Sequence, residues 1–186
     1  MKQAKPLSLF GIDCRHWPED ILMLEKLLTY IAPTGILEIG TRSGPLSLYF
    51  AMYGKINYVS VVTVDISHKR LLRNTRDLLR QLDCSFLKQD CFDLQLASVL
   101  ACEPPRLVYC DGGDKERELE YFSSQLHTTD CIAVHDWITG VDATKFNSDW
   151  EASRGLQPIL EPELARIGAH FRAWVRVGTD WVKTGV

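Results

Sequence analysis

The chain has 186 residues, of which 46% are hydrophobic and 24% are charged, and its formal net charge is −3. These values are typical of one globular domain, and they exclude a disordered chain or a fibre. The weak negative charge disfavours extended binding to nucleic acid or to an anionic membrane, and no apolar run reaches the roughly 20 residues of a membrane span.

The first part of the chain alternates short β-rich runs with helical runs, a pattern typical of parallel strands joined by crossover helices. A helix is expected over Pro18–Ile31, because proline suits the first helical position and acidic residues such as Asp20 suit the positive end of a helix. A strand follows at Ile36–Ile39. The next helix should start near Pro45 and end near Gly54.

The middle of the chain repeats this alternation. A strand at Tyr58–Val64 precedes a helix capped by Ser67, and two further strands are expected at Ser85–Lys88 and Arg106–Cys110. The helix after Ser67 should bury a stripe of leucines on one face. These leucines are Leu71, Leu72, Leu78, Leu79 and Leu82.

The last third begins with a helix over about Lys115–His127. Asp114 precedes it and should be its N-cap, since aspartate is a preferred residue there. A fifth strand is expected at Cys131–Val134, where a short apolar run ends at a polar pair. The stretch that follows is less regular and should hold one helix, at Ala143–Ser153.

The end of the chain alternates in two runs, His170–Val177 and Asp180–Lys183, which predict a closing antiparallel hairpin. We therefore expect an α/β fold with a Rossmann-like, mostly parallel sheet and helices on both faces. A single domain is expected over residues 1–186. Within it, residues 1–34 would form an N-terminal helical segment and residues 35–186 the Rossmann-like core.

An acidic residue follows each of four expected strands. These residues are Asp65, Asp90, Asp111 and Asp136. In an open parallel sheet, the carboxyl ends of the strands line the crevice that binds ligands. The four carboxylates are therefore expected to converge on one edge of the sheet.

The segment Ile36–Gly44 is a strand that runs into a glycine loop and then a helix. Gly40 and Gly44 permit a tight turn and a close approach of the backbone to a ligand. Glu38 would repel a pyrophosphate at this place, but it would attract an ammonium group. S-adenosylmethionine (SAM) carries an ammonium group and a sulfonium. Glu38 therefore favours SAM over a dinucleotide as the ligand.

Glu38, Gly40 and Gly44 together resemble motif I of the class I SAM-dependent methyltransferases, and Asp65 matches the acidic end of the second strand in that family. The resemblance spans about residues 18–184 and implies a seven-stranded sheet. It implies that Asp65 binds the ribose hydroxyls and that Asp90 accepts a hydrogen bond from the adenine amino group. The residues expected to bind SAM are Glu38, Gly40, Thr41, Gly44, Asp65, Ile66, Asp90, Cys91 and Asp111.

A narrower resemblance lies at Tyr109–Asp114 and Val134–Trp137. Both segments resemble the small-molecule O-methyltransferase branch that includes catechol O-methyltransferases and cephalosporin-hydroxylase-like proteins. The resemblance implies that Asp111, His135 and Asp136 bind a divalent metal such as Mg²⁺ or Mn²⁺, which would position the substrate and lower the pKa of its hydroxyl. The same three residues are the expected catalytic group.

The chain departs from this branch in two places. His135 stands where metal-dependent members more often have an acidic residue or an asparagine-containing pair, and Thr128–Asp130 replaces a glycine-rich turn. A histidine with two carboxylates suits Mn²⁺, Fe²⁺ or Zn²⁺ better than Mg²⁺. Without a metal, His135 would be the general base and Asp136 would orient it, unless His135 only caps the strand end. Asp111 could likewise be structural.

We therefore expect a SAM-dependent methyltransferase that modifies a hydroxyl of a small-molecule or sugar-like substrate. Two alternatives remain: a catalytically inactive SAM-binding regulatory or partner protein, and a nicotinamide-dependent oxidoreductase, for which the glycine spacing is poor. No nucleic-acid or membrane partner is expected, and the terminal hairpin could support a homodimer. The N-terminus lacks the apolar core of a signal peptide, so a cytoplasmic location is expected.

Overall fold

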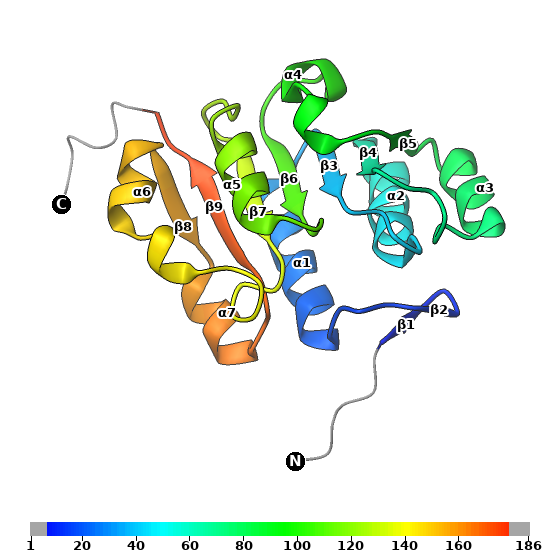
Figure 1. Ribbon diagram of the computed structural model, residues 1–186, viewed down its shortest axis with the longest axis horizontal. Coiled ribbons are helices and arrows are strands. Elements are labelled where there is room, and N and C mark those ends of the chain that lie inside the picture. Colours follow the sequence, from blue (N-terminus) through cyan, green and yellow to red (C-terminus); the bar gives the residue numbers. More distant parts are fainter. Residues whose placement is uncertain (1–6, 179–186) are drawn as a thin grey trace, which may run out of the picture.

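A seven-stranded sheet forms the centre of the protein in this computed structural model, which describes residues 7–178 (Figure 1). Five neighbouring strands run parallel, and β9 runs antiparallel to both of its neighbours. This architecture confirms the expected fold class. In order across the sheet the strands are β5 (Ser85–Lys88), β4 (Ser60–Asp65), β3 (Gly35–Ile39), β6 (Arg106–Cys110), β7 (Cys131–Val134), β9 (Arg172–Arg176) and β8 (Leu156–Ile159).

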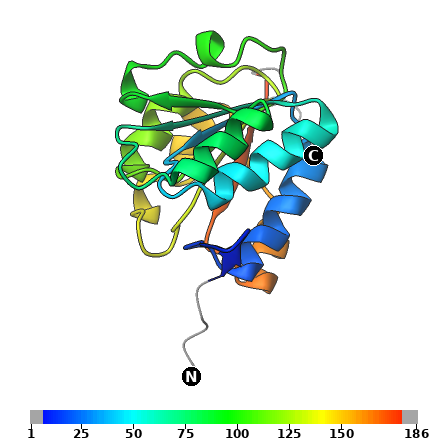
Figure 2. The same ribbon diagram turned by 90° about the vertical axis from the view of Figure 1, so that its right-hand side faces the viewer.

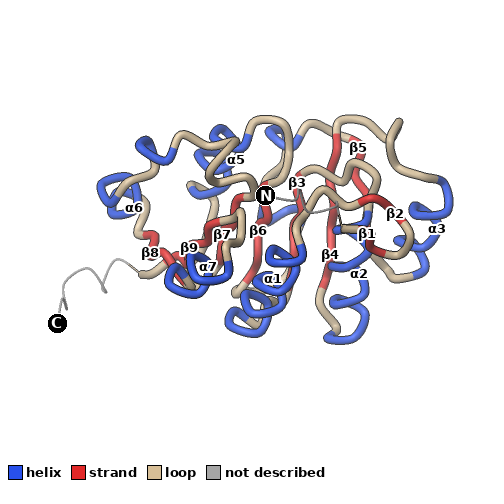
Figure 3. Tube along the Cα trace, turned by 90° about the horizontal axis from the view of Figure 1, so that it is seen from below, coloured by secondary structure: helices blue, strands red, loops and turns tan. Residues whose placement is uncertain are grey.

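Helices cover both faces of the sheet, as Figures 2 and 3 show. One face carries α1 (Pro18–Ile31), α2 (Pro45–Asn57), α3 (Arg73–Gln81) and α7 (Glu161–Ile167). The other face carries α4 (Leu96–Val99), α5 (Lys115–Ser123) and α6 (Ser148–Ser153). The smaller elements are the two-stranded ribbon of β1 (Ser8–Leu9) and β2 (Ile12–Asp13), and the 3₁₀ turns η1 (Cys91–Asp93) and η2 (Ala143–Lys145).

The hydrophobic core has two halves, one on each side of the sheet. Side chains alternate along a strand, so Ile36 of β3 packs under the first group of helices while Leu37 packs under the second. Strands that are buried on both faces require mostly apolar runs, and β3, β6 and β7 have them apart from Glu38 and Arg106. These runs explain why the five parallel strands could be predicted from the sequence.

The helix α1 has the predicted bounds, and it is an integral part of the fold. Met23, Leu24, Leu27 and Leu28 are fully buried in the first half of the core. The prediction of a single domain over residues 1–186 stays a prediction. Within residues 7–178, none of the helices is long and apolar enough to span a membrane.

The predicted leucine stripe after Ser67 is wrong in its extent. Helix α3 begins only at Arg73, and Leu72 and Leu78 are both more than 40% exposed. Only Thr75 and Leu79 are buried on this helix. The reason is that α3 packs against α2 and β5 at the edge of the sheet, where a single narrow face of a helix is covered.

The antiparallel end of the sheet is present, but its strands differ from the expected hairpin. The run Asp180–Lys183 lies outside the described residues, and β9 pairs instead with β7 and β8. Strand β8 contains Pro158, which made this stretch look irregular. A proline is tolerated there because β8 is the edge strand, where a backbone N–H is not required on the outer side.

The segment predicted as one helix over Ala143–Ser153 consists of two shorter elements, η2 and α6. The side chain of Asn147 separates them, because it accepts hydrogen bonds from the backbone N–H groups of Asp149 and Trp150 and so caps α6. The predicted helix after Asp114 is also shorter, ending at Ser123, but Asp114 does cap it through the N–H of Arg117.

Candidate functional site

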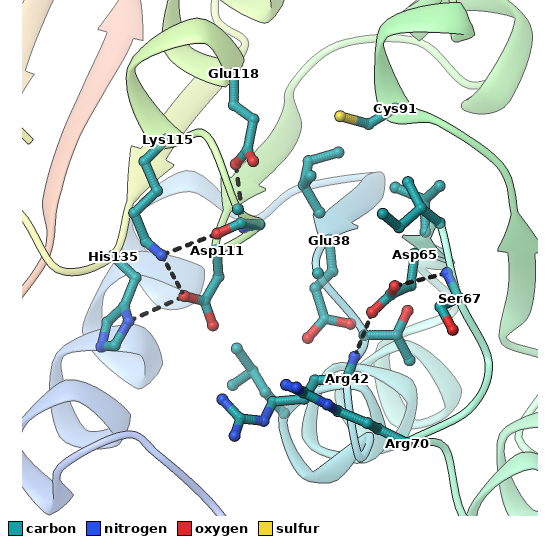
Figure 4. Close-up of a pocket in the computed structure, with 18 of the residues that line it drawn as sticks. Glu38, Arg42, Asp65, Ser67, Arg70, Cys91, Asp111, Lys115, Glu118 and His135 are labelled. Atoms are coloured by element: carbon teal, nitrogen blue, oxygen red, sulfur yellow. Dashed lines mark hydrogen bonds and ion pairs between the residues drawn. The ribbon is translucent and has the colours of Figure 1, made fainter. Parts of the chain in front are cut away.

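A cavity of about 910 Å³ lies at the carboxyl ends of the parallel strands (Figure 4). It opens where β3 lies between β4 and β6, the place at which the strand order reverses and at which open α/β sheets bind ligands. Residues after β3, β4, β5, β6 and β7 line it, together with Asp13, Arg15 and His16 from the segment before α1.

The glycine loop after β3 brings two strand ends into contact. Gly40 has a φ of 100°, and a Cβ atom there would lie 2.4 Å from the carbonyl oxygen of Asp111. Gly44 has a φ of 89° and forms the N-terminal boundary of α2. Both positions therefore require glycine, and the loop lies directly against the end of β6.

Glu38 is buried beneath this loop and faces the cavity. Its Oε2 atom accepts hydrogen bonds from the hydroxyls of Ser47 and Thr63. Thr63 in turn lies 2.5 Å from the hydroxyl of Thr41. Burial raises the pKa of the Glu38 carboxyl to about 7, although both hydroxyls oppose the shift. Among the described residues Oε1 has no hydrogen-bond partner, so it can receive a donor from a ligand.

Asp65, at the end of β4, is held in a fixed orientation by two backbone donors. The N–H of Arg42 donates to Oδ2 at 2.8 Å, and the N–H of Ser67 donates to Oδ1 at 2.9 Å. Each oxygen keeps a lone pair for another donor. Beside it, the side chain of Ile66 is 71% exposed and lines the cavity, which provides an apolar surface next to the carboxylate.

The loop after β5 completes this end of the cavity. Asp90 caps η1 by accepting the N–H of Phe92 at 3.0 Å, and Cys91 and Phe92 line the cavity beside it. Of the nine residues predicted to bind SAM, eight line this one cavity. The exception is Gly44, which does not line the cavity and instead lies against Leu71 and Thr75.

A cluster of charged side chains occupies the other end of the cavity, around Asp111 at the end of β6. His135 Nδ1 lies 3.1 Å from Asp111 Oδ1, and His16 Nε2 lies 3.3 Å from Oδ2. The rings of the two histidines are in contact, with centroids 4.2 Å apart and planes tilted by 34°. Burial would raise the pKa of Asp111, but the two histidines beside it outweigh burial and hold that pKa well below its ordinary value.

His135 is enclosed by carboxylates on both sides of its ring. While Nδ1 faces Asp111, Nε2 lies 3.3 Å from Oδ2 of the fully buried Asp20 in α1. Burial would lower the pKa of His135, but the two carboxylates outweigh it and raise that pKa. An imidazole donates from both nitrogens only when it carries two protons. The two facing carboxylates therefore stabilise the protonated form of His135, and both of its nitrogens are engaged by the protein rather than open to a substrate hydroxyl.

Lys115 joins the carboxylates at the ends of β6 and β7. Its Nζ atom lies 3.3 Å from Asp111 Oδ1, 3.3 Å from Asp136 Oδ2 and 3.1 Å from the carbonyl oxygen of Gly112. Asp136 is the accessible member of the cluster, with its side chain 43% exposed. It has a left-handed backbone with φ of 55°, a strained conformation that is common at functional sites.

The structure brings Asp111, His135 and Asp136 together, but the only three close donor groups among residues 7–178 that could hold a metal are His16, Asp111 and His135. This set does not suit Mg²⁺, which prefers oxygen ligands. Both imidazoles already face carboxylates, and the ammonium of Lys115 lies between Asp111 and Asp136. A divalent cation would therefore have to compete with the ammonium group of Lys115 for both carboxylates.

Three members of the cluster, His16, Asp20 and Lys115, were missed by sequence reasoning. Asp20 was assigned only to the start of a helix, where it does accept the N–H of Trp17. Its contact with His135 could not be predicted, because His135 lies 115 residues away in the sequence. Nothing in the spacing of His16 or Lys115 signals a partner. A lysine four residues after an acidic strand end, as Lys115 is after Asp111, is only weakly indicative.

The cavity entrance near Glu38 is basic. Arg15, Arg42 and Arg70 line it, and Figure 4 shows Arg42 and Arg70 below Glu38. Burial and the positive charges of Arg15 and Arg70 lower the pKa of Arg42. In the described part of the chain, none of the three guanidinium groups has a carboxylate within ion-pair distance, so they are available to an anionic group of a ligand.

Comparison with known proteins agrees with this geometry. The sequence matches a family model described as rhamnosyl O-methyltransferase/CmcI over residues 2–100, more than half of the chain. No curated protein matches it.

Several solved structures share the fold. CmcI with Mg and SAM has a TM-score of 0.69 and 16% identity, covering 92% of this chain and 77% of CmcI. The O-methyltransferase TomG of tomaymycin synthesis from Streptomyces achromogenes, with SAM, has a TM-score of 0.59 and 16% identity, covering 84% of this chain and 78% of TomG. An O-methyltransferase from Bacillus cereus, with S-adenosylhomocysteine (SAH), has a TM-score of 0.58 and 17% identity over 86% and 81%.

Proposed function

Since the chain belongs to the rhamnosyl O-methyltransferase/CmcI family and is a class I SAM-dependent methyltransferase, we propose that it methylates a hydroxyl of a small-molecule or sugar-like acceptor. The single observation that carries this proposal is the cavity of about 910 Å³, which has hydrogen-bond acceptors for SAM at one end and a charged cluster at the other. Its volume lies within the range of small-molecule sites.

The residues at the first end fit the chemical groups of SAM. Glu38 Oε1 faces the cavity and suits the ammonium group, while Arg42 at the entrance suits the carboxylate of the same amino-acid moiety. Asp65 has a fixed carboxylate with two free lone pairs for the ribose hydroxyls. The exposed side chain of Ile66 packs against the nucleoside, and Asp90 accepts from the adenine amino group.

The acceptor then lies at the other end of the cavity, beside Asp111, Lys115 and Asp136. SAM supplies a methyl group on a sulfonium: the C–S bond breaks as the C–O bond forms, SAH leaves, and the hydroxyl proton must be taken up. Asp136 is the accessible carboxylate and takes this proton, because both nitrogens of His135 already face Asp111 and Asp20. Asp111 and His135 hold the cluster in place and act through Asp136 and Lys115.

The first test is calorimetric titration of the full chain with SAH and, separately, with NAD⁺. We expect micromolar binding of SAH and none of NAD⁺. The next measurement is SAH formation from SAM across a panel of hydroxyl-bearing acceptors. Asp136→Asn should retain SAH binding and lose at least 100-fold in turnover.

Two other outcomes of these measurements would favour a different function. Binding of NAD⁺ without binding of SAH would support an oxidoreductase and overturn the proposal. Binding of SAH with no turnover of any acceptor would favour a SAM-binding regulatory protein. Asp83→Asn is the matched control for the charge change, since Asp83 lies outside the cavity in an exposed ion pair with Lys55.

A further inference from the structure

Lys115 lies at the strand ends where the sequence resemblance implied a divalent metal bound by Asp111, His135 and Asp136. The residue opens α5, and its side chain is only 12% exposed. Its ammonium group contacts oxygens of Asp111, Gly112 and Asp136, which come from the ends of two adjacent strands. The ammonium group of Lys115 is therefore a cation between these strand ends, and Figure 4 shows its contact with Asp111.

The surroundings of Lys115 make a second cation unfavourable. Each oxygen of Asp111 faces a histidine, with His135 at Oδ1 and His16 at Oδ2. His135 also faces Asp20 through its other nitrogen. A metal bound by these imidazoles would have to displace the carboxylates that face their nitrogens, and a metal at Asp111 and Asp136 would have to displace the ammonium group.

We propose that Lys115 takes the place of the divalent cation, so that this enzyme transfers methyl groups without a metal and Lys115 holds the acceptor oxygen beside Asp136. This inference rests on the proposed function, and it identifies a binding residue for the acceptor. An ammonium group donates hydrogen bonds to a hydroxyl oxygen and, as a positive charge, stabilises the oxyanion that develops when the proton leaves.

The relation to the structural neighbours supports this reading. CmcI with Mg and SAM shares the fold with this chain at 16% identity. The place of the metal is implied by the sequence resemblance at Tyr109–Asp114 and Val134–Trp137, which lie at the ends of β6 and β7. In this chain an amino-acid side chain, held by three oxygens, fills that place.

The test uses the metal alone and needs no acceptor. Free Mn²⁺ is measured by electron paramagnetic resonance while it is titrated into the SAH-saturated wild type, Lys115→Ala and the control Lys145→Ala. Lys145 also pairs with a carboxylate, Glu116, but it is exposed and lies outside the cavity. We expect no binding below millimolar Mn²⁺ in the wild type and the control, and at least tenfold tighter binding in Lys115→Ala.

Each result decides the question. Binding by the wild type with micromolar affinity overturns the proposal, and so does an absence of binding in Lys115→Ala, because Lys115 would then not occupy a cation site. Adding Asp136→Asn to Lys115→Ala should abolish the new site. SAH binding, measured in every variant, shows that the variant is folded, and its absence in the wild type would contradict the proposed function instead.

A second measurement concerns turnover with any acceptor found active. Wild-type turnover should change less than twofold after treatment with a strong chelator. Lys115→Gln should lower kcat at least 100-fold with the affinity for SAH unchanged, and Lys115→Arg should recover part of the loss because it restores the charge. Loss of wild-type activity on chelation, restored by Mg²⁺ or Mn²⁺, would overturn the proposal.

Discussion

His135 and Asp20 are 115 residues apart in the sequence, yet His135 Nε2 lies 3.3 Å from Asp20 Oδ2. The contact joins the end of β7 to the first turn of α1. Asp20 also accepts the backbone N–H of His170 at 2.7 Å and that of Trp17 at 2.9 Å. One buried carboxylate therefore connects the N-terminal helix to the end of β7 and to the loop before β9.

Asp20→Asn is expected to destabilise the protein by about 3 kcal/mol, because it leaves a buried imidazolium without one of its two partners. The pKa of His135 should fall at the same time, since the carboxylate of Asp20 helps to raise it. Urea unfolding measures the first effect, and the ¹⁵N chemical shifts of the imidazole measure the second. Asp83→Asn, in an exposed pair, should cost less than about 1 kcal/mol. Equal losses in both variants would contradict this prediction.

Cofactor affinity is expected to depend on pH through Glu38. Burial raises the pKa of this carboxyl to about 7, so the group is mostly protonated at pH 6 and mostly ionised at pH 8. Only the ionised form attracts the ammonium group, so the Kd for SAH should rise roughly tenfold from pH 8 to pH 6. Calorimetry at both pH values measures this change.

Glu38→Gln is the matched variant for this measurement. It should bind SAH more weakly than the wild type at pH 8 and show little change between pH 6 and pH 8. The free energy of unfolding of the ligand-free wild type should change with pH in the opposite direction to the affinity for SAH. A buried acid with a raised pKa stabilises the folded state while it is protonated. The free energy of unfolding should therefore decline as the pH rises from about 4.5 to 7. A Kd independent of pH in the wild type would disprove the role of Glu38.

Asp130 is expected to be among the most sensitive structural positions. It is fully buried, and it accepts hydrogen bonds from the Arg106 guanidinium and from the backbone N–H groups of Arg106 and His127. Asp130→Asn should cost about 3 to 5 kcal/mol in the free energy of unfolding, because the buried guanidinium loses its counter-charge. Asp77→Asn, in an exposed pair with Arg80, should change it by less than about 1 kcal/mol.

The chain is expected to unfold as one domain. Helix α1 is buried against the first half of the core, and Asp20 connects it to the site. Urea unfolding followed by far-ultraviolet circular dichroism should therefore coincide with unfolding followed by fluorescence of Trp150 and Trp174, which lie in the second half of the core. An earlier loss of helical signal would show that the segment 1–34 is a separate unit.

Local features of the sequence were sufficient to predict most of the sheet. The apolar runs of the five parallel strands, Pro18 at the start of α1 and the glycines of the loop after β3 act over a few residues. Parallel pairing then brings Asp65, Asp90, Asp111 and Asp136 to one edge whatever the rest of the chain does. That is why Glu38, Asp65 and Asp111, which line one cavity, could be expected near one another in advance.

Tertiary packing alone decided the charge state and the partners of the cluster. Whether His135 acts as a base or a cation depends on Asp20, which α1 delivers from the other end of the chain, and on Asp111. The cation between Asp111 and Asp136 depends on the direction in which the Lys115 side chain points from α5. The sequence by itself determined which strand ends meet. The packing of distant segments determined which charges meet there, because electrostatic interactions at 3 to 4 Å depend on three-dimensional distance and burial and not on sequence spacing.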